Sequence, residues 1–215
     1  MTTSLVLRVT DKDGRSYGGF QWPMTVGTEV IAPNWEPTAE CGNGLHGWLY
    51  GNGYHSVATI DNDSKWFVVE VLTSTIINLD GKCKFPRCTV CFVGDRKSAA
   101  DYLIAHESRA QCVIGANLTV GDKQSCSVGA LGYAQGGDRA TVTGGDRATV
   151  TGGNWATVTG GDRATVTGGD RAELQLRYWD FIANRYRTKL GYIGENGLLP
   201  NTRYKLNDKQ EFEPC

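Results

Sequence analysis

Residues 136–175 read GGDRATVT GGDRATVT GGNWATVT GGDRATVT GGDRAELQ, which are five consecutive units of eight residues. The same frame extends upstream through three less similar octads, VGALGYAQ, VGDKQSCS and CVIGANLT, so that eight octads cover residues 112–175. A fixed period of this kind is the sequence signature of a repeat architecture. It also explains why the chain is rich in glycine, with 28 among 215 residues, because a pair of glycines recurs at the start of each regular octad.

Each octad divides into a strand and a turn. Ala-Thr-Val-Thr is β-branched and alternating, which predicts a short strand. Gly-Gly-Asp-Arg is turn chemistry, with Gly expected to supply positive φ and Asp to bond its own backbone. Alternation places Ala140 and Val142 on one face and Thr141 and Thr143 on the other. The inward column continues through Leu118, Cys126, Ala134 and Leu174.

A four-residue strand cannot bury its apolar face alone, so the octads are expected to stack. Two octads per coil predict a two-sided parallel β-solenoid of about four 16-residue coils, about 4.8 Å apart. A three-sided coil would need 24 residues, which does not divide the 64 residues of the repeat. An antiparallel meander is the rival, and it is disfavoured because identical octads stack best in register with themselves.

The solenoid is expected to carry its threonines outward as ladders on both broad faces. One octad has Asn154-Trp155 in place of Asp-Arg, which exposes an indole at a turn; this is either a contact point or a chance surface exchange. The period of eight, and Asp directly after the glycine pair, do not match the nine-residue calcium-binding repeat. The candidate binding surface comprises Thr141, Thr143, Thr157 and Thr159 on one face, Thr149, Thr151, Thr165 and Thr167 on the other, and Trp155.

The segments on either side of the repeat predict a mainly β protein in three parts. Residues 1–111 form a mixed β domain with one short helix at 97–106, residues 112–175 the solenoid, and residues 176–215 a C-terminal β cap. Both flanks are expected to cover the unpaired strand edges at the ends of the solenoid. The candidate strands are residues 4–10, 65–72, 74–79, 88–93, 173–179, 185–193 and 204–206.

The octad resembles the AGYGSTQT-type octapeptide of bacterial ice nucleation proteins, which also has glycine at the turn, a small residue inward and T-x-T on the strand. This resemblance implies a two-octad coil and T-x-T rows that order water. The chain departs from that family in having only eight octads. It also carries Asp138, Asp146, Asn154 and Asp162 where the family has a turn tyrosine.

Nearly the whole chain resembles an uncharacterised family found in phages and in the bacterial genomes that carry them. The resemblance implies this architecture and a phage-like origin, and it implies no particular activity. The similar stretches, besides the octads, are GGFQWPMTVGTEVIAPNWEPTAECGNGLHGWLYG (18–51), KFPRCTVCFVGD (84–95), RKSAADYLIAH (96–106) and LQLRYWDFIANRYRTKLGYIGENGLLPNTRYKL (174–206).

His46, in ECGNGLHG close to Cys41, is the best single candidate for catalysis. A Cys–His nucleophile would need the thiol within hydrogen-bond reach and a third orienting group, so a structural role for His46 is favoured. Cys83, Cys88 and Cys91 provide one tight pair where a zinc site needs four ligands, and they are interpreted as small buried residues on strands, with zinc as the alternative. No known catalytic or nucleotide-binding motif occurs in a suitable context. The chain is therefore expected to be no enzyme and to need no cofactor or metal, although the N-terminal domain leaves this open.

Composition limits the class of protein further. A net charge of -1 argues against a general binder of nucleic acid, and no apolar run is long enough to span a membrane. The first residues lack a secretory pattern, which predicts a soluble protein in the cytoplasm of a host cell or in a virion.

The sequence thus favours a non-enzymatic, phage-like structural or interaction protein whose rigid solenoid contacts another copy, a virion component or a host protein. Binding of ice or ordered water through the T-x-T ladders is one alternative. An enzyme or host-defence inhibitor built on the N-terminal domain is the other.

Overall fold

The computed structural model describes residues 2–57 and 60–215, and it divides into two compact units, Met1–Val113 and Ile114–Cys215. The first unit contains an antiparallel sheet and one α-helix, and the second contains only strands and turns. This confirms the predicted fold class: a mainly β protein with an N-terminal mixed β part, a two-sided parallel solenoid and a β cap.

The N-terminal unit is built on one sheet of seven strands in the order β2-β7-β4-β1-β3-β6-β5, all paired antiparallel. The predicted strand at 74–79 is mostly wrong, because a 3-10 turn, η3 (Thr73–Thr75), precedes a strand of only two residues. The strands are β1 (Thr3–Thr10), β2 (Glu29–Ile31), β3 (Leu45–Leu49), β4 (Lys65–Leu72), β5 (Ile77–Asn78), β6 (Cys83–Phe85) and β7 (Arg87–Gly94); two further 3-10 turns are η1 (Tyr17–Gly19) and η2 (His55–Val57).

Both faces of this sheet are covered, so its central strands are apolar on both sides. On one face, Val6 of β1 and Phe67 of β4 pack with Trp22 in a core that also includes Cys83 and Cys88. The helix α1 (Arg96–His106) contacts β1, β4 and β7 and buries Leu103. Asp95 caps the helix by accepting a hydrogen bond from the backbone N–H of Ser98 (2.9 Å).

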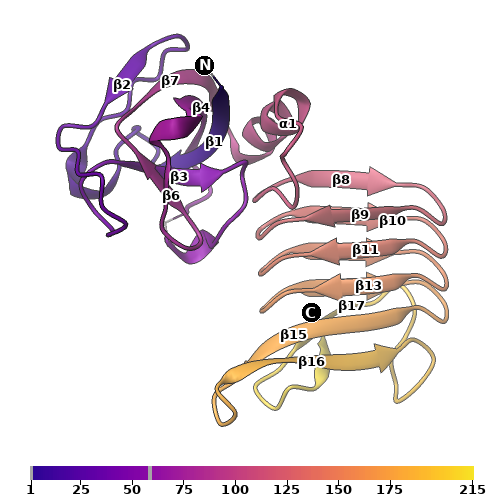
Figure 1. The fold of residues 1–215 in the computed structure, drawn as a ribbon. Coiled ribbons are helices and arrows are strands. Elements are labelled where there is room, and N and C mark those ends of the chain that lie inside the picture. The colour runs from indigo at the N-terminus through magenta and orange to yellow at the C-terminus, as the bar shows by residue number, and fades with distance from the viewer. Residues whose placement is uncertain (1, 58–59) are drawn as a thin grey trace. The chain divides into compact units, whose positions relative to one another are not determined.

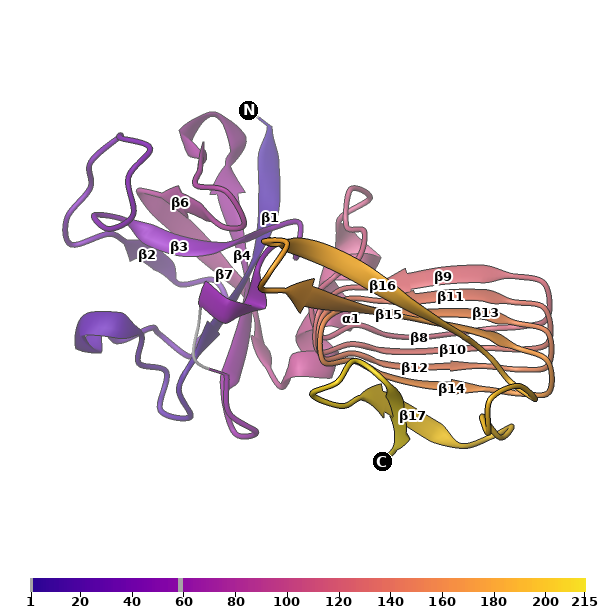
Figure 2. The same ribbon diagram turned by 90° about the horizontal axis from the view of Figure 1, so that it is seen from below.

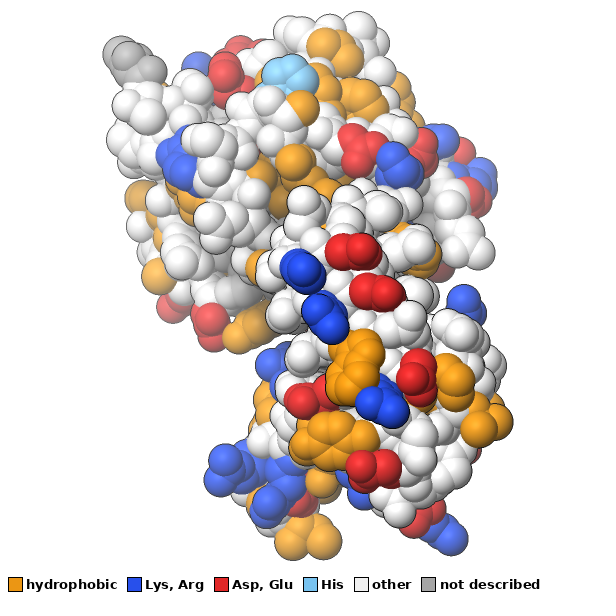
Figure 3. Space-filling view, turned by 90° about the vertical axis from the view of Figure 1, so that its right-hand side faces the viewer, with side chains coloured by type: hydrophobic (Ala, Val, Ile, Leu, Met, Phe, Trp, Pro, Cys, Tyr) orange, Lys and Arg blue, Asp and Glu red, His pale blue; other side chains and the backbone are white. Residues whose placement is uncertain are grey.

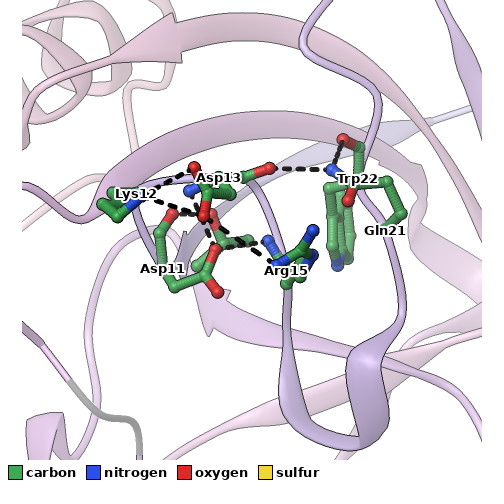
Figure 4. Close-up of polar contacts among 7 residues, drawn as sticks. Asp11, Lys12, Asp13, Arg15, Gln21 and Trp22 are labelled. Atoms are coloured by element: carbon green, nitrogen blue, oxygen red, sulfur yellow. Dashed lines mark hydrogen bonds and ion pairs between the residues drawn. The ribbon is translucent and has the colours of Figure 1, made fainter.

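A charged turn with the sequence DKDG (residues 11–14) ends β1 (Figure 4). The Asp11 carboxylate accepts hydrogen bonds from the backbone N–H groups of Asp13 and Arg15, and Lys12 Nζ lies 3.0 Å from Asp13 Oδ1. That hydrogen bond raises the pKa of Lys12 and lowers the pKa of Asp13. The turn is exposed and every charge in it has a local partner, so we assign it a structural role.

In the C-terminal unit each octad contributes one strand, and successive strands alternate between two stacked sheets (Figure 1). Strands pair in parallel with the strand sixteen residues later, for example Thr149 with Thr165 and Val150 with Val166. We call the two sheets the β8 sheet and the β9 sheet. The β8 sheet contains β8 (Asn117–Val120), β10 (Tyr133–Gly136), β12 (Thr149–Gly152) and β14 (Thr165–Gly168); the β9 sheet contains β9 (Ser125–Val128), β11 (Thr141–Gly144), β13 (Thr157–Gly160) and β15 (Glu173–Asp180).

The strand within each octad is Thr-Val-Thr-Gly, one residue later than predicted. Ala140 lies in the turn and still points inward, so Ala140, Val142 and Gly144 together form the thin core and are all buried. The first glycine of each pair is required by this packing. A Cβ on Gly144 would lie 2.5 Å from Cγ2 of Val150.

The prediction that the octad glycines adopt positive φ is wrong. In every regular turn the left-handed residue is the fourth of the octad, such as Arg147 (φ 56) and Trp155 (φ 59). The second glycine serves close stacking of the turns, because a Cβ on Gly145 would lie 2.6 Å from the backbone nitrogen of Ala130 in the preceding coil.

The aspartates also act between coils and not within their own turn. Asp138 Oδ1 accepts a hydrogen bond from the backbone N–H of Asn154 (2.8 Å), and Asp146 Oδ1 accepts one from that of Asp162 (2.9 Å). Asn154 continues the first column by accepting from Asp170 N–H (2.8 Å). Each carboxylate or amide therefore ties one coil to the next.

Antiparallel strands extend both sheets beyond the last coil (Figure 2). Leu198 and Tyr204 are buried at this end of the solenoid, together with Ile193. The strand β16 (Arg185–Tyr192) pairs with β15, β17 (Arg203–Leu206) pairs with β14, and β18 (Phe212–Pro214) pairs with β17. No helix within residues 2–57 and 60–215 combines the length and the apolar character that a membrane crossing requires.

Candidate functional site

The outer face of the β9 sheet carries two rows of hydroxyl groups. Thr141 lies in register with Ser125 and Thr157, and Thr143 lies in register with Ser127 and Thr159. Val142 and Val158, between the threonines of each strand, are fully buried, which holds the hydroxyl-bearing side chains outward. Neighbouring hydroxyl positions are about 4.8 Å apart between coils and about 6.8 Å apart along a strand.

Two features keep this array regular. Threonine is stiff at χ1 because it is branched at Cβ. The backbone under it is tied by parallel ladders and by the Asp columns at the turns. Among the described residues, Thr159 donates a long hydrogen bond to Gln175 Oε1 (3.5 Å), and the hydroxyls of Thr141, Thr143 and Thr157 have no protein partner. These groups are available to water.

The β8 sheet presents a shorter array. Thr149 and Thr165 are in register, as are Thr151 and Thr167, but Thr165 donates to the Thr149 hydroxyl (3.3 Å). In the coil before them, the matching positions are Tyr133 and Gln135, which bond to each other through the Tyr133 hydroxyl (3.0 Å). Beyond the last threonine rung the antiparallel strand β17 follows. The β9 sheet therefore offers the longer run of hydroxyl rungs.

Sequence reasoning missed Ser125 and Ser127 as members of the first face. Their octad, VGDKQSCS, is degenerate, but it keeps a hydroxyl at both strand positions where the later octads have threonine. A search for any hydroxyl residue at these positions of the period would have found them.

The turns that follow the β8-sheet strands form a charged edge with a shallow groove of about 360 Å³ (Figure 3). Trp155 lies in this edge with 52% of its surface exposed, and the guanidinium of Arg171 stacks 4.7 Å from its ring centre. The other lining residues include Asp138 and Asn154, whose Oδ1 atoms already bond the next coil. The structure thus places Trp155 away from the threonine rows, on a turn.

The structure does not join Cys41 and His46 by a hydrogen bond. The Cys41 thiol is exposed and contacts Lys82 Nζ (2.9 Å), while His46 lies on β3, where its carbonyl accepts from Arg8 (2.8 Å). Burial, with the positive charges of Lys82, Arg8 and Lys84, lowers the pKa of His46 to about 4. An imidazole whose pKa lies this far below neutral pH is a weak general base.

The three clustered cysteines take positions on the sheet of the N-terminal unit. Cys83 and Cys88 lie in its core, where burial raises the pKa of each thiol to about 12. Cys91 is half-buried. Within the part of the chain that the structure describes, no three His, Cys, Asp or Glu side chains are grouped as a metal site would need, and all cysteines are free.

Comparison with known proteins finds two kinds of similarity. Residues 4–105 match the family model of a domain of unknown function (DUF7666). The chain is similar to an ice nucleation protein of Xanthomonas campestris pv. translucens (36% identical over 104 residues, 47% of this chain and 6% of that protein) and to one of Pseudomonas syringae pv. syringae (36% over 118 residues, 54% and 10%). It is also similar to ice nucleation protein InaU of Pantoea ananas (32% over 106 residues, 48% and 10%).

The chain thus spans a tenth or less of the length of these curated relatives. No solved structure matches it. The comparisons support the likeness of its octads to those of ice nucleation proteins, alongside a domain of unknown function over residues 4–105.

Proposed function

We propose that the solenoid binds ice or ordered water through the outer face of the β9 sheet. The observation that carries this proposal is the pair of in-register hydroxyl rows, Ser125–Thr141–Thr157 and Ser127–Thr143–Thr159. Fixed donors and acceptors at a regular spacing hold water molecules at that spacing, and a rigid surface does so at little entropic cost. The similarity to ice nucleation proteins supports the same interpretation.

The small size of the outer face of the β9 sheet limits how strongly it can bind ice. Three rungs and two columns span only about 10 Å by about 7 Å, which contacts a handful of water molecules. We therefore expect adsorption to existing ice crystals, and we expect nucleation of ice to be weak beside that of proteins with long arrays.

The test compares one substitution on the two faces. Thr143→Lys places a long, hydrated side chain in the middle rung of the β9 sheet, and Thr151→Lys makes the same change at the same strand position of the β8 sheet. Thermal hysteresis and inhibition of ice recrystallisation are expected in the native protein, to be lost in Thr143→Lys and to be kept in Thr151→Lys. Absence of both effects in the native protein, or equal loss in the two variants, would contradict the proposal.

The use of the solenoid as a contact surface for another protein remains a prediction, as do the absence of enzymatic activity and the location of the protein.

A further inference from the structure

The C-terminal hairpin of β15 and β16 leaves one long strand edge open. Both strands have eight residues, against four in the other solenoid strands, and they pair antiparallel along their whole length. β16 is the terminal strand of the β9 sheet, where Figure 1 shows it beyond β15 and the shorter strands. An open edge of this kind presents unpaired backbone donors and acceptors.

The register identifies which backbone groups point outward. Glu173 N–H bonds back to Ala156, and Ile193 N–H bonds to the carbonyl of Ala172, so the odd-numbered residues of β16 face β15. In an antiparallel strand the alternate residues direct their N–H and C=O groups to the other side. The outward backbone groups of β16 are therefore those of Tyr186, Thr188, Leu190 and Tyr192, and the carbonyl of Tyr192 already accepts from the N–H of Glu195.

The side chains of β16 have opposite characters on its two faces. Arg185, Arg187 and Lys189 share one face, and only Arg187 has a carboxylate partner among the described residues, Asp180 at 2.6 Å. On the other face Tyr186 and Leu190 are each 45% exposed. The edge is thus basic on one face and largely apolar on the other.

Pairing with a second copy of the same strand is unfavourable in the register that aligns the two strands over Tyr186–Leu190. An antiparallel pair of two β16 strands centred on Thr188 would place Arg187 of each copy opposite Lys189 of the other. Like charges directly opposite each other destabilise a sheet. An opposing strand with acidic residues on that face would instead meet opposite charges at every second position.

We propose that β16 is a docking edge for an extended segment of a partner protein that adds to the β9 sheet as an antiparallel strand. The segment alternates acidic residues, opposite Arg185, Arg187 and Lys189, with apolar residues, opposite Tyr186 and Leu190. The backbone ladder supplies affinity and the alternating side chains supply specificity, as in other cases of strand addition. The hairpin tip, with Phe181 and Ile182 almost fully exposed, extends the apolar contact.

The test uses a fluorescently labelled peptide of alternating Glu and Val, and fluorescence anisotropy with the full chain. Thr188→Pro removes one outward N–H without touching the bonds to β15, and Thr188→Val keeps it. We expect Thr188→Pro to weaken binding at least about tenfold, the loss of roughly one hydrogen bond, and Thr188→Val to bind as the native protein does.

A charge exchange keeps the proposal falsifiable if the proline variant disturbs the hairpin. Lys189→Glu is expected to weaken binding of the Glu-Val peptide and to strengthen binding of a matching Lys-Val peptide. The proposal is overturned if the native protein does not bind the Glu-Val peptide, if the charge exchange has no effect, or if oligothymidylate binds more tightly. A dimer in sedimentation that the peptide does not dissociate would also overturn it, in favour of a second copy.

Discussion

At the scale of single residues, side-chain oxygens in the turns after the β8-sheet strands connect neighbouring coils. Asp138 accepts from the backbone N–H of Asn154, and Asn154 accepts in the same way from Asp170, at 2.8 Å in both cases. The amide oxygen of Asn154 takes the place of a carboxylate oxygen without change of distance. We therefore expect the hydrogen-bond acceptor to contribute more to stability than the negative charge.

This equivalence predicts opposite outcomes for two substitutions of Asp138. Asp138→Ala leaves the N–H of Asn154 without its acceptor and should lower the free energy of unfolding by about 1 kcal/mol. Asp138→Asn keeps the acceptor and should change it by less than about 0.5 kcal/mol. Urea unfolding followed by circular dichroism measures both. Equal destabilisation by the two variants would show that the charge is what counts.

At the scale of elements, Glu107 ties the end of α1 to the first strand. Its carboxylate is buried, accepts from the backbone N–H of Leu5 on β1 (3.3 Å) and lies 2.6 Å from Arg109 Nε. The hydrogen bond from Arg109 is the main reason that the pKa of Glu107 lies below its ordinary value of 4.5. The ionised carboxylate therefore stabilises the folded N-terminal unit.

A lowered pKa in the folded state gives this contribution a definite pH dependence. It is complete above the unfolded value of 4.5 and is lost as the pH falls through the lower folded value. Glu107→Gln should therefore reduce the free energy of unfolding by about 1–3 kcal/mol at neutral pH and by much less near pH 3. Urea titrations followed by tryptophan fluorescence at both pH values test this. A difference that does not depend on pH would contradict it.

At the scale of the whole molecule, the unit of construction is the coil of two octads. Strands pair at a separation of sixteen residues, and the cap is specific for each sheet, since β16 extends the sheet of β15 and β17 extends that of β14. Removing one octad moves every later strand to the opposite sheet, whereas removing two restores the alternation.

Two deletions in the identical octads test this. Deletion of residues 137–152 removes one coil and should leave a folded, cooperative protein of somewhat lower stability. Deletion of residues 137–144 presents the cap to the wrong sheets, and it should give a broad unfolding transition and aggregation despite losing fewer residues. Differential scanning calorimetry and light scattering measure both outcomes. A folded protein after the shorter deletion would mean that the cap does not distinguish the sheets.

The octad by itself determined the solenoid, because a period of eight with Val142 between Thr141 and Thr143 leaves one apolar face, and stacking buries it. The helix 96–106 and the strands 4–10 and 65–72 were likewise predictable to within a residue or two, because strong local periodicity or alternation marks them. Tertiary structure alone decided where the positive φ falls, why each glycine is required, and that Asp138 bonds a residue in the next coil. These features depend on contacts between residues sixteen or more positions apart. The pattern of apolar and polar residues within one octad does not specify those contacts.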